Sequence, residues 1–171
     1  MSNNDTNYEV NNQKKTDVMG FNLSSTAFEE DANIPTKHSC KGDDTSPPLR
    51  WDEVPGGTAS FALILEDPDA PNGTFCHWIV YNLPEDCREL EAVIPIQKKL
   101  DNGAMQGQND FGKIGYGGPC PPQGEEHRYF FRLFALKKKL SPESANRSED
   151  FYNAVNGLIL GKAEYMGRFK K

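Results

Sequence analysis

The stretch that decides the fold runs from Glu66 to Asn82 and reads Glu-Asp-Pro-Asp-Ala-Pro-Asn-Gly-Thr-Phe-Cys-His-Trp-Ile-Val-Tyr-Asn. Apolar runs at residues 61–65 and 79–83 flank a connection that is rich in proline, glycine and asparagine. Such runs, joined by turn-forming residues, predict the two strands of a β-hairpin. If these strands pair, Asp67 leaves the first strand at the end where His77 enters the second.

A second histidine lies beside a loop of unusual composition. His127 opens a third strand-like run, residues 128–136, and follows residues 115–122, which read Gly-Tyr-Gly-Gly-Pro-Cys-Pro-Pro. This density of glycine and proline excludes the interior of a helix or strand. Consecutive glycines let backbone N–H groups hold an anion, and an imidazole near an anion or carboxylate tends to be cationic. We therefore expect acid, imidazole and glycine loop to form one pocket for a small oxyanion.

The role of the carboxylate stays open on these residues alone. An ionised Asp67 repels phosphate, but it holds a histidine ring and raises its pKa if it bonds His77 or His127. A carboxylate that kept its proton would instead donate to a phosphate oxygen. Taken singly, the segment at residues 67–71 is equally an ordinary turn, and His77 an ordinary core histidine.

Together these motifs resemble a known family. The resemblance is carried by residues 67–71, 77–78, 115–122 and 124–129, which are similar in type and order to the two signature blocks of the phosphatidylethanolamine-binding protein (PEBP) family. The chain is most similar to its bacterial and archaeal branch, often called Raf-kinase-inhibitor-like proteins, over residues 21–169.

This resemblance implies a fold, a ligand class and a set of site residues. The fold is mostly β, with a large antiparallel-rich central sheet, a smaller second sheet and a few flanking helices. The ligand is a phosphate-bearing small molecule or a phosphorylated partner, no cofactor is implied, and the molecule pairs as a homodimer. Carried over position by position, the ligand-binding residues are Asp67, Asp69, Pro71, His77, Gly118, Pro119, His127 and Tyr129.

Two departures from the eukaryotic members bear on function. The connection from Pro71 to His77 lacks their longer, aromatic-bearing loop, and Tyr165 is only a candidate for their C-terminal pocket tyrosine. Kinase inhibition and lipid-headgroup binding depend on those features. Both roles are therefore in doubt for this chain.

Two classes of function remain. The first is a binding module that regulates or inhibits a partner enzyme by occupancy of the anion pocket. The second is a hydrolase or lyase in which His77 and His127 act as acid and base, with Asp67 orienting one of them. The sequence has no Gly-x-Ser-x-Gly, His-Glu-x-x-His or Walker motif and no evident nucleophile, so binding is favoured.

Composition restricts partners and location. The 171 residues suit one domain, residues 19–171, preceded by a polar tail at residues 1–18 that we expect to be flexible. With 25 acidic against 19 basic residues the net charge is -6, so the run Lys137–Lys139 is interpreted as a solvated turn and no nucleic acid is expected. Neither end has an apolar stretch for membrane insertion or a signal sequence, which favours the cytoplasm.

Cysteine spacing argues against a metal site. None of Cys40, Cys76, Cys87 and Cys120 forms a Cys-x-x-Cys pair, and a cytosolic setting favours free thiols. A metal-ligand pair of Cys76 and His77 is the alternative, but neighbours on a strand point to opposite faces. A buried thiol is the preferred interpretation of Cys76, and no metal is expected.

Strand parity and capping residues give further expectations. Parity places His77 with Ile79 and Tyr81, His127 with Tyr129, and Arg128 on the opposite face, so the charge that meets the anion comes chiefly from histidine. Ser141-Pro142-Glu143 predicts a short helix, and Ser148 starts a longer one. The longer helix carries an apolar stripe of Phe151, Val155, Leu158 and Ile159, and three aromatic residues are assigned to the core: Trp51, Trp78 and Phe130.

Overall fold

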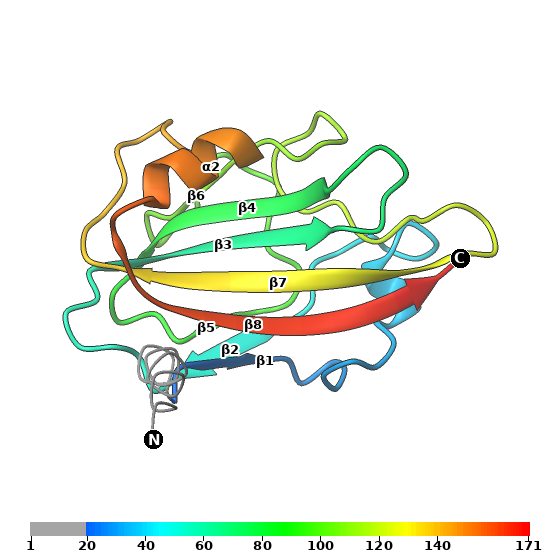
Figure 1. Ribbon diagram of the computed structural model, residues 1–171, viewed down its shortest axis with the longest axis horizontal. Helices are drawn as coiled ribbons and strands as arrows, with labels where there is room; N and C mark the ends of the chain where they lie inside the picture. The colour runs from blue at the N-terminus through cyan, green and yellow to red at the C-terminus, as the bar shows by residue number, and fades with distance from the viewer. Residues whose placement is uncertain (1–19) are drawn as a thin grey trace, which may run out of the picture.

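Two antiparallel sheets make up most of the molecule (Figure 1). The computed structural model describes residues 20–171, and the expected tail at residues 1–18 lies outside the described residues. The larger sheet has the strand order β6-β4-β3-β7-β8 and the smaller one the order β1-β2-β5. In chain order the elements are β1 (Asn22–Ser24), the 3-10 helix η1 (Thr36–His38), β2 (Leu49–Asp52), β3 (Ser60–Asp67), β4 (Phe75–Pro84), β5 (Glu89–Leu90), β6 (Met105–Gln106), β7 (Glu126–Leu136), α2 (Ser148–Val155) and β8 (Ile159–Lys170).

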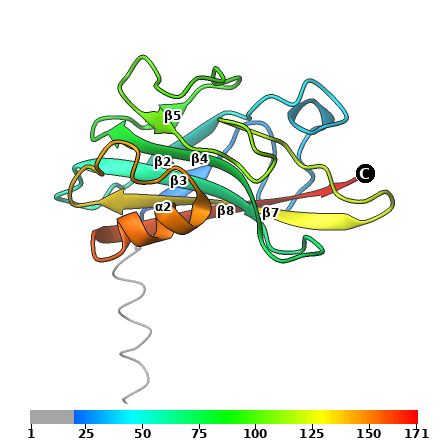
Figure 2. The same cartoon turned by 90° about the horizontal axis from the view of Figure 1, so that it is seen from above.

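The larger sheet is covered on both faces. The smaller sheet packs on one face and α2 lies on the other, as the view from above shows (Figure 2). Every residue of β3 is buried, because this central strand has neighbours on both sides and a layer on each face. The expected fold, mostly β with a large and a small sheet, is confirmed.

The helical expectations are confirmed only in part. The helix that starts at Ser148 is present, but it ends at Val155, and Gly157 turns the chain with a φ of 83°. Ile159 therefore begins β8 and is exposed, so it does not extend the apolar stripe. The short helix expected at residues 141–143 is wrong, since Glu143 has a φ of 71°, which breaks a right-handed helix.

The aromatic core assignments are right for two of three residues. Trp51 and Trp78 are buried between the two sheets. Phe130 instead lies half-buried on the other face of β7, beneath the guanidinium group of Arg132 at 4.7 Å from the ring centroid. Its neighbour Tyr129 takes the inward position, because adjacent strand residues alternate between faces.

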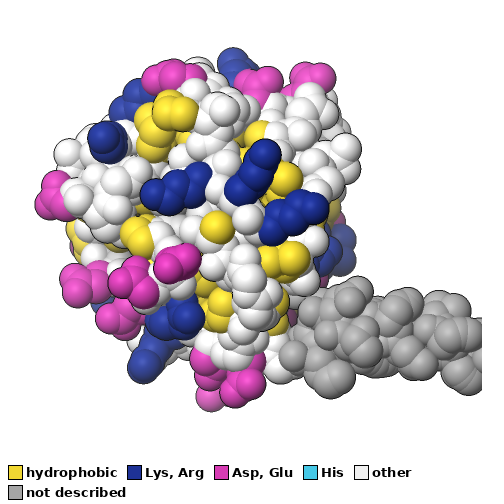
Figure 3. Space-filling model, turned by 90° about the vertical axis from the view of Figure 1, so that its left-hand side faces the viewer, with side chains coloured by type: hydrophobic (Ala, Val, Ile, Leu, Met, Phe, Trp, Pro, Cys, Tyr) yellow, Lys and Arg dark blue, Asp and Glu magenta, His cyan; other side chains and the backbone are white. Residues whose placement is uncertain are grey.

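The lysine run forms an exposed turn directly after β7. Lys137, Lys138 and Lys139 are all exposed, and Leu140 behind them is buried. Figure 3 views this end of the molecule and shows basic side chains mixed with acidic and apolar ones, with no histidine in view. This is the arrangement of a solvated turn.

Candidate functional site

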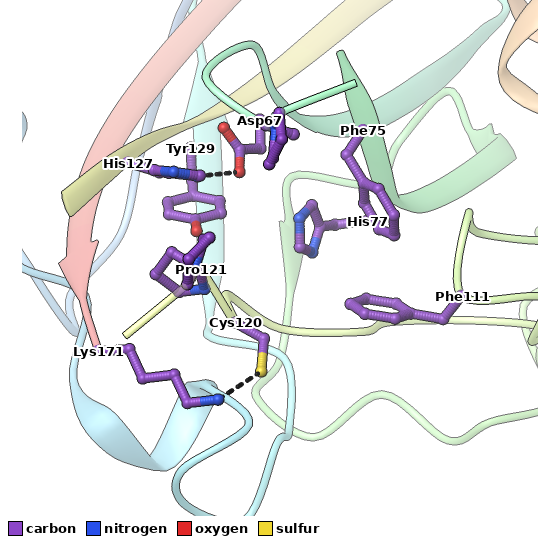
Figure 4. A pocket seen from close by; sticks show the side chains of 12 residues that line it. Asp67, Phe75, His77, Phe111, Cys120, Pro121, His127, Tyr129 and Lys171 are labelled. Carbon is purple, nitrogen blue, oxygen red and sulfur yellow. Dashed lines mark hydrogen bonds and ion pairs between the residues drawn. The ribbon is translucent and has the colours of Figure 1, made fainter. Parts of the chain in front are cut away.

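Three strand ends meet at one end of the larger sheet. β3 finishes with Asp67 opposite Phe75, the first residue of β4. β7 enters at the same end through His127, which pairs with Phe169 near the end of β8. The antiparallel register therefore brings Asp67, His77 and His127 together, as the predicted hairpin requires (Figure 4).

A β-bulge determines where His77 points. Trp78 pairs with Leu65, whereas Cys76 pairs with the next residue of β3, Glu66. His77 is thus an extra residue of β4 between these two pairs, and a bulge of this kind disturbs the alternation of side chains. Sequence parity cannot anticipate such an insertion.

The predicted strand face is therefore wrong for His77 and right for His127. His77 does not share a face with Ile79 and Tyr81, which belong to the cluster beneath α2. Its ring instead meets Tyr129 edge-on, with 5.3 Å between centroids. His127 stacks on Tyr129 at 6.5 Å and shares its face, as predicted. Both imidazoles therefore contact the same buried tyrosine ring.

These side chains line a cavity of about 320 Å³ at the sheet end (Figure 4). Five of the eight expected ligand-binding residues lie on its wall, and three, Asp69, Gly118 and Pro119, do not. The wall consists of Asp67, Ala70, Pro71, Phe75, His77, Phe111, Cys120, Pro121, Pro122, His127, Tyr129 and Lys171.

His127 lies between two carboxylates. Its Nδ1 is 2.8 Å from Oδ2 of Asp67, and its Nε2 is 3.0 Å from Oε1 of Glu125. Burial by itself lowers the pKa of His127, but the hydrogen bonds to Asp67 and Glu125 outweigh it and raise the pKa above the ordinary value. Asp67 also accepts the N–H of Asp69 at 2.8 Å. The geometry thus matches the alternative in which this aspartate holds a histidine ring.

His77 is a different kind of histidine. Its Nδ1 lies 2.7 Å from the carbonyl oxygen of Gly117, which can only accept, so Nδ1 carries the hydrogen. Burial lowers the pKa of His77, and the hydrogen bond to Gly117 opposes this only in part. The neutral ring has a lone pair on Nε2. His77 therefore does not supply the positive charge that the sequence assigned to it.

Tyr129 brings an unpaired donor to the site. Its side chain is buried between the two imidazoles, and within the described part of the chain its hydroxyl has no hydrogen-bond partner. Burial and the neighbouring Asp67 carboxylate raise the pKa of Tyr129, so the hydroxyl keeps its proton. An unpaired buried donor costs about 1–3 kcal/mol, which a bound oxygen atom relieves.

The glycine loop serves packing rather than an anion nest. The N–H of Gly117 donates to the carbonyl of His77 at 2.9 Å, and that of Gly118 donates to Oδ1 of Asp44 at 2.8 Å. A Cβ on Gly118 would lie 2.2 Å from the carbonyl oxygen of His38. Glycine is needed there for close backbone approach, and these two N–H groups are already used.

Asp69 secures the loop between β3 and β4 from outside the cavity. Its carboxylate takes two hydrogen bonds from the guanidinium group of Arg128, at 2.8 and 2.9 Å, and one from the Arg128 N–H at 3.0 Å. These bonds lower the pKa of Asp69 to about 2. Arg128 leaves on the face opposite His127, as parity predicted, and it is not part of the cavity wall.

The chain matches the model of one protein family over most of its length. The family model described as phosphatidylethanolamine-binding protein matches residues 24–170. The chain belongs to the PEBP family.

Relatives and solved structures agree with this assignment. A UPF0098 protein of Methanothermobacter thermautotrophicus is 45% identical over 151 residues, which is 88% of this chain and 99% of that relative. A UPF0098 protein of Aquifex aeolicus is 47% identical over 86% of both chains. The crystal structure of the PEBP homologue CT736 of Chlamydia trachomatis is similar with a TM-score of 0.80 and 41% identity, covering 89% of this chain and 98% of that one. YbcL of E. coli, a PEBP family member, gives 0.83 and 35%, covering 89% and 99%.

The pocket of this PEBP contains one basic residue that was not predicted from the sequence. Lys171, directly after β8, lies on the cavity wall, with Nζ 3.7 Å from Sγ of Cys120. The alternation of charged residues with small or aromatic ones along residues 161–170 was the available signal, but no strand was predicted there. Tyr165, the candidate for a pocket tyrosine, is buried in the core and donates to the carbonyl of Phe28.

The expectation of four free thiols is wrong. Cys40 and Cys120 form a disulfide that links the end of η1 to the pocket loop. Cys76 and Cys87 are free, and Cys76 is buried beneath α2, turned away from His77 as predicted. The two bonded residues are 80 positions apart, so only the fold brings them together.

Residues 20–171 contain neither a metal-ligating cluster nor a membrane-spanning helix. No group of three or more histidine, cysteine, aspartate or glutamate side chains in this range could hold a metal ion. No helix in the same range is long and apolar enough to cross a membrane.

Proposed function

We propose that this PEBP binds a phosphate-bearing small molecule, or the phosphate of a phosphorylated partner, in the cavity between His77 and Lys171. The observation that carries the proposal is Tyr129 on the cavity wall, whose buried hydroxyl is a neutral donor with no hydrogen-bond partner among the described residues. An oxyanion is the natural occupant, because every phosphate oxygen accepts hydrogen bonds.

Two cations support this occupant. Lys171 brings an ammonium group to the wall, and the raised pKa of His127 keeps its ring charged at mildly acidic pH. Nε2 of His127 is held by Glu125, whose side chain is 58% exposed. A ligand anion takes this nitrogen by displacing Glu125 into solvent, whereas buried Asp67 stays on Nδ1.

The protein acts by occupancy, as a regulator or inhibitor of a partner enzyme. Among the described residues, the cavity wall has no serine or threonine that could act as a nucleophile, and its one cysteine, Cys120, is bonded in a disulfide. No observation favours the hydrolase or lyase alternative. We also propose a cytoplasmic homodimer, and light scattering tests the pairing, since a particle of 19.1 kDa would be a monomer.

Calorimetric titration of inorganic phosphate and a phosphomonoester into wild type and Tyr129→Phe tests the binding proposal. The variant removes only the hydroxyl, and loss of one hydrogen bond should weaken binding by about ten-fold. Tyr152→Phe is the matched control, because its hydroxyl donates to Glu66 on the other face of the sheet. Equal affinity of wild type and Tyr129→Phe, or no heat with any phosphate compound, would contradict the proposal.

A further inference from the structure

The Cys40–Cys120 disulfide opens onto two cavities. Both cysteines are half-buried, and Cys120 lies on the wall of the phosphate pocket. Both also line a second cavity of about 560 Å³, which Phe111 shares with the pocket. A disulfide that can be approached from solvent is far easier to exchange than one enclosed in a core.

One of the two sulfur atoms has a cationic neighbour. The ammonium group of Lys171 lies 3.7 Å from Sγ of Cys120 (Figure 4). A positive charge at this distance favours the thiolate over the thiol. The sulfur that is more stable as a thiolate is also the faster leaving group in thiol–disulfide exchange.

The loops that the disulfide joins are also held without it. Three hydrogen bonds that use no sulfur atom connect the segment after Pro35 to the pocket loop, with lengths of 3.0, 2.8 and 2.6 Å. They run from Cys40 N–H to the carbonyl of Pro119, from Gly118 N–H to Oδ1 of Asp44, and from the Tyr116 hydroxyl to the carbonyl of His38. Opening the disulfide therefore leaves Cys120 on the pocket wall.

We propose that this disulfide is a redox-active site whose partner is a dithiol reductant. A thiolate of the dithiol attacks Sγ of Cys40 and forms a mixed disulfide. The bond between the protein sulfurs breaks, and its electron pair leaves on Cys120, beside Lys171. The second thiolate of the dithiol then attacks the mixed disulfide, frees Cys40 and closes the disulfide of the reductant. Two electrons pass to the protein, and the two protons of the dithiol go to the protein sulfurs or to water.

The reduced state therefore carries a reactive thiol in the phosphate pocket. Cys76 and Cys87 provide internal comparisons. Burial raises the pKa of Cys76 to about 12, so this thiol is inert while the fold is intact. Cys87 is half-buried, and burial raises the pKa of its thiol as well, although the nearby Arg88 partly opposes this. The redox proposal does not depend on what anion the pocket binds, since it rests on the disulfide and Lys171 alone.

The proposal is tested by chemical labelling of the full chain. The protein is treated with dithiothreitol, alkylated with iodoacetamide and digested, and mass spectrometry of the peptides measures the label on each cysteine. We expect reduction under native conditions, alkylation of Cys120 at least about ten-fold faster than of Cys87 at neutral pH, and no label on Cys76. One unit of pKa changes the thiolate fraction by about ten-fold, so Lys171→Met should slow alkylation of Cys120 by about that factor. Lys138→Met, on the exposed turn at the other end of the sheet, is the matched control.

Three results would overturn the proposal. The first is reduction only together with labelling of Cys76, which would mean that the bond opens only when the chain unfolds. The second is an unchanged rate for Cys120 in Lys171→Met. The third is a purified protein with four free thiols that diamide does not oxidise.

Discussion

Oε1 of Glu125 lies 3.0 Å from Nε2 of His127, so an exposed carboxylate occupies the ring nitrogen that the proposed anion would have to reach. Asp67 holds the other nitrogen at 2.8 Å and is buried. Only Glu125 is free to move into solvent, because its side chain is 58% exposed and that of Asp67 only 5%. Glu125 is therefore an internal competitor of the anion proposed to bind here, and Asp67 is a fixed support of the ring.

Replacing Glu125 by glutamine should strengthen phosphate binding. The change removes a negative charge that competes for His127, and we expect affinity to rise about three- to ten-fold at mildly acidic pH, which corresponds to about 1 kcal/mol. The same change removes one of the groups that raise the pKa of His127, so the gain should shrink as pH rises. Glu126→Gln is the control, because this neighbour is exposed and faces Arg168. Weaker binding by Glu125→Gln at pH 6 would mean that Glu125 helps to hold the ligand.

Phosphate affinity should fall as pH rises through the pKa of His127. Since this pKa is raised above 6.5, the ring is charged below it and loses its charge above it. Loss of a charge-assisted hydrogen bond costs about 1.5–3 kcal/mol, or roughly ten-fold or more in affinity. Calorimetry across pH 5 to 9 should show this dependence in wild type and a flatter one in His127→Gln. The comparison cancels the titration of phosphate itself, and identical profiles would exclude His127 as the source of charge.

The pair of Asp69 and Arg128 should stabilise the fold above acidic pH. The pKa of Asp69 is lowered from 3.8 to about 2, so its contribution is present above the ordinary value and is lost as pH falls through about 2. Both side chains are partly exposed, so we expect Asp69→Asn to lower the free energy of unfolding by only about 1 kcal/mol at pH 7. Urea titrations should show this loss shrinking at acidic pH. Asp43→Asn, at an exposed position, should have little effect at any pH, and an equal effect of both variants would contradict the prediction.

Gly118→Ala should destabilise the protein because there is no space for a side chain. The added Cβ would lie 2.2 Å from the carbonyl oxygen of His38 and 2.6 Å from Oδ1 of Asp44. Overpacking of this kind costs about 1–3 kcal/mol, which denaturant titration measures as a lower midpoint with an unchanged slope. Gly56→Ala is the control, since nothing lies within 4 Å of its added Cβ. A Gly118→Ala variant as stable as wild type would require the loop to move away from η1.

The positions of the main strands could be predicted because they depend on local sequence patterns. The continuous apolar runs on either side of Asp67 and His77, joined by turn-forming residues, specify a hairpin of buried strands, and the register then places both residues at one end of the sheet. The same holds for His127 and Tyr129, whose parity the structure keeps. The helix at Ser148 was also predicted. Its N-cap residue is Arg147, which makes no side-chain capping hydrogen bond, so the local signal is the pair of acidic residues in the first turn, Glu149 and Asp150.

By itself, the sequence determined the family, the pairing of the central strands and the meeting of two histidines at the end of the sheet, because each depends on neighbouring residues. Only the tertiary structure decided the chemistry of the pocket. A single bulge turns His77, burial makes it neutral, and contacts from elsewhere in the chain bring Lys171 and the disulfide to the wall. Charge state depends on desolvation and on the distance between groups, and both are fixed only when distant segments pack together.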